Sequence, residues 1–340
     1  MITNMRYTRR VQSVRDVLVL HLRSGHYRPG DRFLSNRALA KRHAISYQTA
    51  DRLLRDLVQE GLLERRSQSG TYVTGEPLCL DSVALVMHPS AVSPGSFGAK
   101  MRAILTEALE GVTDTPFLTL LDEEPEPPNG SIRVVWERPA LAQRWAEQGY
   151  RVVLVNDTPP LGNALQHIDG VATDNVAGGA LAANLLGRFV QDKTRLVILA
   201  GPHDDHRAMD RVAGFRSQLD ASVVWADSWH SQEGLAVARE VMSAKPTGIF
   251  TCGDRLAEGL ATYCTRTGLA LPPIVGFDDA PIAQTIGLTT IAIPWREIAQ
   301  GVRQIVTDRL RGSTSAAVRQ SYVPLPKLRT LGLTQHAAAF

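Results

Sequence analysis

The stretch AISYQTADRLLRDL, residues 44–57, predicts an amphipathic helix whose first turn is polar. Ser46 can serve as its N-cap, because the hydroxyl can accept a hydrogen bond from an otherwise unpaired backbone N–H group. Apolar residues recur at helical spacing and predict one buried stripe: Ala50, Leu53, Leu54, Leu57 and Val58. The first turn instead carries Tyr47, Gln48 and Thr49, which no core requires. We therefore expect these three side chains to contact a partner.

The sequence before this helix predicts a helix-turn-helix. Apolar spacing gives a first amphipathic helix, built on Val11, Val14, Leu18 and Leu22, that ends at the Gly and Pro of RSGHYRPGD. LSNRALAKRH, residues 34–43, predicts a short helix capped by Ser35, with Ala38 and Leu39 facing inward. A tight turn at 43–45 follows. The second helix of such a motif can enter the major groove of DNA, where polar side chains read base edges.

The segment after this helix predicts a basic β-hairpin. LLERRSQSGTYV, residues 62–73, contains two short strand-like pieces around a Ser-Gln-Ser-Gly turn. Arg65 and Arg66 are placed to contact phosphates or the minor groove. The alternative is a helical hairpin that packs on another domain with its polar residues in water. The basic charge, the helix-turn-helix spacing and the basic hairpin together favour DNA binding.

Charge divides the chain into a basic head and an acidic body. Residues 1–74 contain 14 Lys and Arg against 6 Asp and Glu, whereas the remainder contains 23 against 28. This asymmetry predicts one domain for a polyanion and another for a different ligand.

A length of 340 residues predicts two or three domains. No apolar run approaches a membrane span, and no secretory signal is evident. Widely spaced cysteines predict reduced thiols in the cytoplasm: Cys79, Cys252 and Cys264.

The body alternates apolar β-branched runs with helical stretches. The runs are SVALVM, FLTLL, SIRVVW, YRVVLVN, RLVILA, SVVWA, TGIFTC and PIVGF, with helices expected near 97–111, 138–148, 175–191, 206–220, 231–244 and 254–268. This βαβ rhythm predicts an α/β fold of doubly wound parallel sheets. Ligands of such sheets bind beyond the carboxyl ends of the strands. Small polar residues and an aromatic ring follow several runs there, as in Asn156-Asp157, Asp227-Ser228-Trp229, Gly253-Asp254 and Asp278-Asp279.

The head resembles the winged-helix domain of GntR-family bacterial regulators across residues 25–73. The matching pieces are PGDR, Ser35, Arg37, LA, Ser46, Thr49, the L..L..EGLL run, RR and SGTYV. The resemblance assigns DNA contacts to Arg37, to the start of the second helix and to the wing. The residues assigned to DNA are Arg37, Ser46, Tyr47, Gln48, Thr49, Arg52, Arg65, Arg66, Gln68 and Gly70. The family commonly has Arg at Tyr47 and Asp51, and Gly at Ala44 and Gln68, so these departures bear on the sequence that is read.

The body resembles the effector domain of LacI-family repressors, a two-lobed relative of periplasmic sugar-binding proteins. Five segments agree in order: VATDNVAGGALAANLL, LAGPHDDHRAMDRVAGFR, GIFTCGDRLAEGLA, IVGFDDAPIA and LTTIAIPWREIAQ. The resemblance assigns effector contacts to Ser90, Phe97, Asn156, Arg211, Trp229, Asp278 and Trp295. Carboxylate, guanidinium and indole groups are suited to a sugar-like ligand. The family usually has Asn at Gly253, and a helix where the Pro-rich residues 122–130 exclude one.

Structural roles are open for three of these residues. Asp278, or better its neighbour Asp279, could cap the following helix. Arg211 could pair with a carboxylate at a lobe interface, and Trp229 could be a core residue.

HDDH, residues 203–206, does not predict a metal site, because four consecutive loop residues rarely converge on one ion. No catalytic motif or cofactor site is evident either, and we expect no enzyme activity.

The sequence thus predicts a winged helix-turn-helix at 1–75, a linker at 76–82 and an effector domain at 83–340. Its first lobe spans about 83–168 and 294–318, and its second spans about 169–293 and 319–333. We expect a cytoplasmic homodimer that binds an operator, represses carbohydrate-use genes and responds to a sugar-like effector in the interlobe cleft. The alternatives are a solute-binding protein of the periplasmic type, an activator, a regulator with a non-sugar effector, or an enzyme fused to a DNA-binding head.

Overall fold

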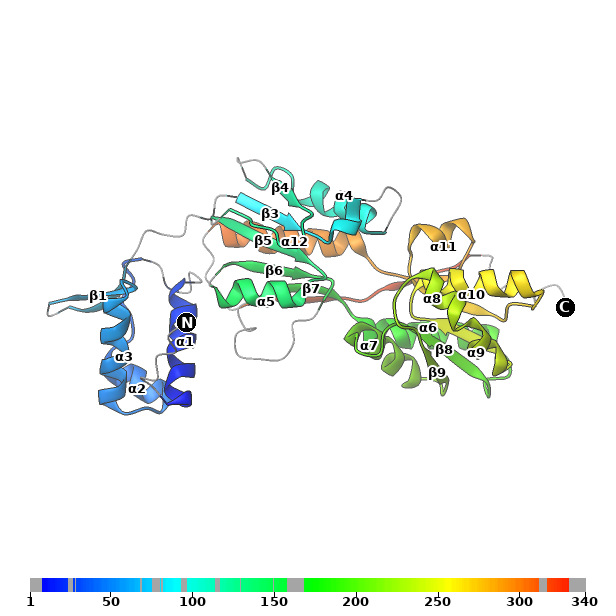
Figure 1. Ribbon diagram of the computed structural model, residues 1–340, viewed down its shortest axis with the longest axis horizontal. Coiled ribbons are helices and arrows are strands. Elements are labelled where there is room, and N and C mark those ends of the chain that lie inside the picture. The colour runs from blue at the N-terminus through cyan, green and yellow to red at the C-terminus, as the bar shows by residue number, and fades with distance from the viewer. Residues whose placement is uncertain are drawn as a thin grey trace. The chain divides into compact units, whose positions relative to one another are not determined.

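The computed structural model describes residues 8–23, 27, 29–67, 69–74, 80, 82–92, 97–113, 117–128, 130–148, 150–157, 168–311 and 317–329. The chain divides into two compact units (Figure 1). Unit 1 comprises residues 1–90, 102–171 and 299–320, and unit 2 comprises residues 91–101, 172–298 and 321–340. Within unit 1 we call residues 8–74 the head and the remainder the first lobe.

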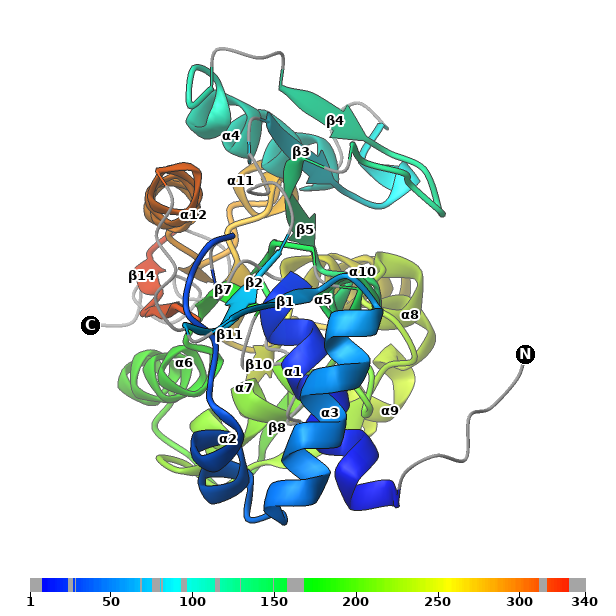
Figure 2. The same cartoon turned by 90° about the vertical axis from the view of Figure 1, so that its left-hand side faces the viewer.

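The head consists of three helices and a hairpin (Figure 2), namely α1 (Arg9–Arg23), α2 (Asn36–His43), α3 (Tyr47–Gln59), β1 (Leu63–Arg66) and β2 (Gly70–Val73). One apolar cluster holds these elements together: Leu18, Leu22, Phe33, Leu39, Ala50, Leu53, Leu54, Leu57, Leu63 and Val73. Strands β1 and β2 pair antiparallel, with Leu63 opposite Val73. The head therefore has its own core, which the spacing of its apolar residues predicts.

Both predicted N-caps of the head are confirmed. Ser35 accepts a hydrogen bond from the backbone N–H of Ala38, and Ser46 accepts one from that of Thr49. The predicted inward face of α2 is only half right, because Leu39 is buried and Ala38 is exposed. Adjacent residues of an α-helix lie about 100° apart around its axis, so a helix with one narrow buried stripe turns one of the two outward.

The described part of the first lobe contains a sheet in the order β13-β7-β6-β5-β3-β4. Its strands are β3 (Ser82–Val86), β4 (Leu118–Leu120), β5 (Ser131–Trp136), β6 (Val152–Val155), β7 (Asp169–Thr173) and β13 (Arg319–Tyr322). The pairings from β4 through β7 are parallel, and β3, β5 and β6 are buried along their whole length. Accompanying helical segments are η1 (Pro89–Val92), α4 (Phe97–Leu109), α5 (Pro139–Glu147) and α12 (Trp295–Leu310). Residues 91–92 of η1, 97–101 of α4 and 295–298 of α12 belong to unit 2. Burial on both faces explains why these strands read as continuous apolar runs.

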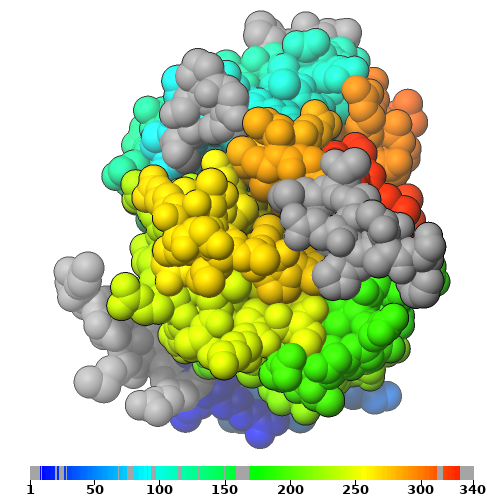
Figure 3. Space-filling view, turned by 90° about the vertical axis from the view of Figure 1, so that its right-hand side faces the viewer, coloured from blue at the N-terminus to red at the C-terminus, as the bar shows by residue number. Residues whose placement is uncertain are grey.

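The described part of unit 2 contains a second sheet, in the order β14-β12-β11-β10-β8-β9. Its strands are β8 (Leu196–Ala200), β9 (Ser222–Trp225), β10 (Gly248–Thr251), β11 (Ile274–Asp278), β12 (Thr290–Ala292) and β14 (Leu325–Lys327). Its helices are α6 (Asn175–Phe189), α7 (His206–Arg216), α8 (Ser231–Ala236), α9 (Ala238–Ser243), α10 (Asp254–Thr267) and α11 (Pro281–Thr285). Helix α10 lies at the surface of this unit and is yellow in Figure 3. The predicted α/β class with parallel sheets is confirmed.

Two details differ from the βαβ pattern read from the sequence, and one agrees with it. Strand β14 pairs antiparallel with β12, and neither strand was among the predicted runs. The helix predicted at 231–244 is two helices, α8 and α9, which meet at Val237. Residues 122–128 of the Pro-rich segment form no helix, as the prolines predict.

Two glycines let helices α6 and α7 approach closely. A Cβ atom on Gly179 of α6 would lie 2.1 Å from the carbonyl oxygen of Arg211, and one on Gly214 of α7 would lie 2.0 Å from that of Val176. Backbone atoms cannot move aside as side-chain tips can. The close approach brings α7, which carries Arg211, against the start of α6.

We expect Gly179→Ala to destabilise unit 2 by about 2 kcal/mol or more, because the added methyl group overpacks a backbone contact. Gly187→Ala on the same helix is the matched control: its Cβ would meet the flexible tip of Leu219 at 3.2 Å. This control should be neutral or more stable by up to about 1 kcal/mol, because alanine favours the helix. Urea unfolding of the two variants measures the difference, and equal midpoints would contradict the proposed contact.

Candidate functional site

The first turn of α3 forms an exposed polar surface on the head. Ser46 Oγ accepts the backbone N–H of Thr49 at 3.0 Å and lies 2.8 Å from Thr49 Oγ1. The apolar stripe of the same helix is fully buried, with 0% exposure at Ala50, Leu53, Leu54 and Leu57. Tyr47 is 54% exposed, and Gln48 is exposed too. The structure thus places these side chains where a partner can reach them.

Exposed basic side chains lie on the two helices of the helix-turn-helix. Arg37 on α2 and Arg52 on α3 are both exposed. Arg10 of α1 donates to the carbonyl oxygen of Ala44 at 3.2 Å and so ties the first helix to the turn between α2 and α3.

The two wing arginines already make ion pairs within the head. Arg65 Nη2 lies 2.8 Å from Asp51 Oδ1, and Arg66 Nη2 lies 2.6 Å from Glu64 Oε1. The guanidinium of Arg66 also lies 4.3 Å from the ring centre of Tyr72. Both partners of the Arg66–Glu64 pair are well exposed, so this pair contributes little stability, whereas Asp51 in the other pair is only 25% exposed. That these arginines contact DNA therefore stays a prediction.

The wing turn depends on a glycine. Gly70 has φ +127°, a conformation that side-chain-bearing residues rarely adopt, and its Cβ would lie 3.2 Å from Arg32 Nε. Gln68, the other predicted contact at the wing tip, lies outside the described residues.

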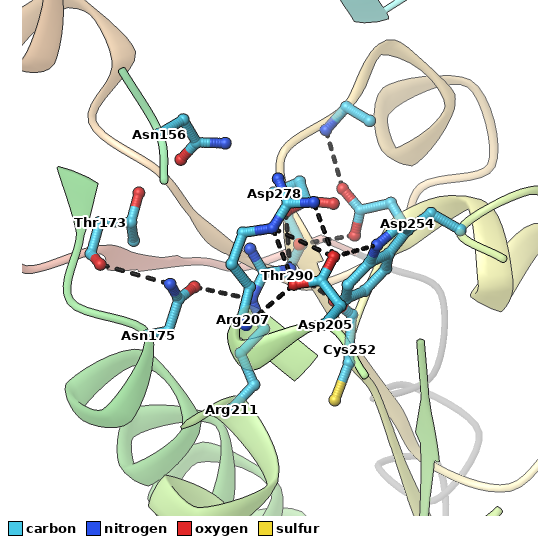
Figure 4. A network of polar contacts seen from close by, with 12 residues as sticks. Asn156, Thr173, Asn175, Asp205, Arg207, Arg211, Cys252, Asp254, Asp278 and Thr290 are labelled. Atoms are coloured by element: carbon cyan, nitrogen blue, oxygen red, sulfur yellow. Dashed lines mark hydrogen bonds and ion pairs between the residues drawn. The ribbon is translucent and has the colours of Figure 1, made fainter. Parts of the chain in front are cut away.

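In unit 2, a buried guanidinium lies at the carboxyl ends of the strands (Figure 4). Arg211 of α7 is 4% exposed. It donates to Asn175 Oδ1 at 2.8 Å, to the carbonyl oxygen of Cys252 at 2.6 Å and to Asp278 Oδ1 at 3.0 Å. Asn175 begins α6, Cys252 follows β10 and Asp278 ends β11. One side chain therefore joins three elements at the edge where parallel sheets bind ligands.

A second carboxylate lies beside this cluster. Asp205 caps α7 and accepts hydrogen bonds from the guanidinium of Arg207, the nearest at 2.7 Å, and from the Trp229 indole at 2.9 Å. Burial raises the pKa of Asp205, but the hydrogen bonds and charge of Arg207, with the Trp229 hydrogen bond, outweigh it and lower the pKa to about 2. The Trp229 ring centre lies 5.4 Å from the Arg211 guanidinium, while the ring also packs against the core of unit 2. Trp229 thus joins core and polar cluster.

Asp254 fixes the backbone next to this cluster. It is fully buried and accepts the Ala280 backbone N–H at 2.8 Å and the Thr290 hydroxyl at 2.7 Å. Burial, together with the nearby charge of Asp278, raises the pKa of Asp254 well above its ordinary value. Asp254 therefore fixes the backbone just after Asp278.

The open question of a helix cap at Asp278 and Asp279 is answered. Helix α11 has Ala280 as its N-cap residue, with no side-chain cap hydrogen bond, so neither aspartate caps it. Asp278 pairs with Arg211 within unit 2, whereas Asp279 pairs with Lys327 and Arg329. Both aspartates have positive φ, 106° and 56°. Such strained conformations in non-glycine residues cluster at functional sites.

The remaining predicted effector residues lie in separate groups. Phe97 and Trp295, both in unit 2, meet edge to face with ring centres 5.5 Å apart. Asn156, in unit 1, is 5% exposed, has φ 59° and donates to Glu137. The side chain of Ser90 lies outside the described residues.

Sequence reasoning did not assign Asn175, Asp205 or Asp254 to the site. Each follows a strand or opens a helix at the carboxyl edge of the sheet, and that position was the available signal.

In the described part of the chain, no group of three or more His, Cys, Asp or Glu could hold a metal ion. His203 of the HDDH segment stacks edge to face on Trp225.

Two parts of the chain each match a known protein family. Residues 10–73 match the family "Bacterial regulatory proteins, gntR family", and residues 137–286 match "Periplasmic binding protein domain". The chain joins a GntR-family head to a periplasmic-binding-protein-like body. Across the described residues of both parts, no helix combines the length and apolar character needed to cross a membrane.

The curated relatives are regulators with a helix-turn-helix. The HTH-type transcriptional regulator CelR of Thermobifida fusca is 25% identical over 174 residues, which are 47% of this chain and 51% of the relative. The HTH-type transcriptional repressor PurR of Vibrio vulnificus is 25% identical over 157 residues, 42% of this chain and 46% of the relative. The chain thus spans about half the length of the curated relatives it matches.

Solved structures share the fold of the binding-protein-like body. A CelR–cellobiose complex is 19% identical, with TM-score 0.61, covering 84% of this chain and 91% of that chain. A LacI-family regulator from Enterococcus faecium with bound ribose is 20% identical, with TM-score 0.58, covering 73% and 97%. These structural similarities show that the body of this chain has the same fold as those proteins.

Asp254→Asn should make the stability of the body less dependent on pH. Because the folded-state pKa of Asp254 is raised, its contribution is full below the ordinary value of 3.8 and is lost as pH rises through the folded value. Asn cannot ionise. The free energy of unfolding of Asp254→Asn, relative to that of the wild type, should therefore increase with pH by at most about 1.4 kcal/mol per pH unit. Thermal unfolding from acid to neutral pH measures this. Asp227→Asn, at an exposed position, is the control. Parallel curves of stability against pH for Asp254→Asn and the wild type would contradict a raised pKa of Asp254.

Proposed function

We propose that this chain is a sequence-specific DNA-binding transcriptional regulator of the cytoplasm, a repressor of carbohydrate-use genes that responds to a small effector. Its proposed parts are a DNA-binding domain at 1–75, a linker at 76–82 and an effector domain at 83–340. The observation that carries the proposal is the exposed polar first turn of α3 within a head that matches the GntR family.

The head supports docking of α3 in the major groove. Tyr47, Gln48 and Thr49 lie at the N-terminal end of the helix, which is the end that enters the groove in helix-turn-helix proteins. Arg37 and Arg52 flank this turn and are suited to phosphates or base edges. The net basic charge of residues 1–74 favours a polyanion.

The charges of the unit 2 cluster favour a neutral polyhydroxylated effector. Arg207 and Arg211 are balanced by Asp205 and Asp278, and burial, which raises the pKa of Asp254, disfavours the charged form of that group. No positive charge in this cluster is therefore left over for a phosphate or carboxylate. Sugar hydroxyls can donate to Asp278 and accept from Arg211 while an indole face packs on the ring. The sugars in the related structures, cellobiose and ribose, support this class.

The regulator acts as a homodimer, in which two heads meet two half-sites of an operator. To shift operator occupancy from 1:99 to 99:1, the effector needs about 5.5 kcal/mol of differential affinity for the two conformations. By linkage, operator DNA then weakens binding of an inducer by the same factor.

Gln48→Ala should weaken binding to DNA fragments from around the protein's own gene about tenfold, because one base-edge contact is lost. Gln59→Ala at the other end of α3, also exposed, should bind like the wild type, and neither change should alter thermal stability. Mobility-shift titrations at several salt concentrations measure both effects. Affinity of the wild type that is indifferent to salt would rule out phosphate-driven docking.

Arg211→Ala and Asp278→Asn should abolish both ligand-induced thermal stabilisation and the effect of ligand on DNA binding. Ligand at 100 times its Kd stabilises the folded state by about 2.7 kcal/mol. Arg216→Ala, on the exposed side of the same helix α7, is the control and should keep the full response. A screen of neutral sugars and sugar phosphates identifies the ligand. A full response in both cluster variants would place the effector elsewhere.

A further inference from the structure

An acidic residue lies among the basic side chains at the DNA-facing end of the head. Asp51 Oδ1 accepts hydrogen bonds from Asn36 Nδ2 at 2.9 Å and from Arg65 Nη2 at 2.8 Å. Its Oδ2 lies 2.9 Å from Arg55 Nη2. These four residues, the Asp51 cluster, come from α2, α3 and the first wing strand. One carboxylate therefore connects all three elements that surround the reading surface.

The Asp51 cluster also reaches the first turn of α3. Asn36 Nδ2, which donates to Asp51, lies 3.4 Å from the Tyr47 hydroxyl. The hydrogen bond from Arg65 lowers the pKa of Asp51, so that the group is a carboxylate at neutral pH. Tyr47 and the wing are thus arranged around one fixed negative charge.

A negative charge at this place works against DNA affinity. Phosphates repel a carboxylate, and Arg65 cannot neutralise a phosphate while it is paired with Asp51. By contrast, Arg37 makes no ion pair within the described part of the head, so its full charge is available to DNA. The gain that can offset this loss is discrimination, because specific recognition often includes elements that disfavour the wrong partner.

We propose that Asp51 is a positioning residue for DNA selectivity: it withholds Arg65 from indiscriminate phosphate contact and holds Asn36 and Tyr47 in one arrangement. The inference rests on the proposed function of the head. Only duplexes that fit this fixed arrangement bind tightly. Asp51 acts through its partners rather than on a base, because three donors already occupy most of the about four acceptor positions of its two oxygen atoms.

The test uses the full chain and two duplexes of equal length: one enriched by the wild type from a random pool, and its scrambled counterpart. Asp51→Asn should bind the scrambled duplex about threefold or more tightly at low salt. The slope of log affinity against log salt should steepen by about one, because the released Arg65 gains a phosphate. The ratio of enriched to scrambled affinity should fall about tenfold.

A second substitution separates positioning from a merely structural role. Adding Arg65→Gln to Asp51→Asn should return the scrambled-duplex affinity and the salt slope toward wild-type values, because the released cation is gone. The control Asp16→Asn removes the same charge from an exposed site on α1 and should leave the ratio unchanged. If Asp51→Asn does not fold, Asp51→Ser, which also removes the charge, takes its place.

Three results would overturn the proposal. The first is an unchanged selectivity ratio in Asp51→Asn, and the second is an equal loss in Asp16→Asn. The third is a changed preference at a single base pair that Arg65→Gln does not reverse, which would mean that Asp51 reads that base. A wild type that enriches no duplex would instead overturn the proposed function.

Discussion

A buried positive charge organises the ligand-facing edge of unit 2. Removing the Arg211 guanidinium from water is strongly unfavourable unless its donors are satisfied. The fold meets this requirement with an amide, a backbone carbonyl and a carboxylate from Asn175, Cys252 and Asp278. These groups belong to elements distant in sequence, so the pairing holds the carboxyl ends of β10 and β11 against α6 and α7. The glycine contacts between α6 and α7 are what bring Arg211 within reach.

The same arrangement explains why the site is polar yet nearly neutral. Each cation in the cluster has a carboxylate of its own, Arg207 with Asp205 and Arg211 with Asp278. Groups that are already paired can exchange a protein partner for a ligand hydroxyl without leaving an uncompensated charge. The positive φ of Asp278 is a strained backbone conformation of the kind found at functional sites.

The sequence predicted those features that depend on neighbouring residues. The Ser46 cap, the buried stripe from Ala50 to Leu57 and the parallel strands all follow from local spacing and are found. Strand β14 was missed because its three residues are all exposed and show no alternation. The Asp51 cluster was missed for another reason: Asn36 and Arg65 lie 15 and 14 positions away, and only the tertiary fold brings them together. The resemblance pointed to Arg211 and Asp278, whereas Asn175, which accepts a hydrogen bond from Arg211, required the structure.

The path of the chain has a consequence for how the protein is made. Strand β14, which covers the edge of β12, follows residues 299–320, and these belong to unit 1. During synthesis the ribosome must therefore deliver a segment of the other unit before the sheet of unit 2 gains its outer strand. Until then the backbone groups of β12 form an open template for unwanted pairing between chains. The pairing of β12 with β14 therefore completes the sheet of unit 2 late in synthesis.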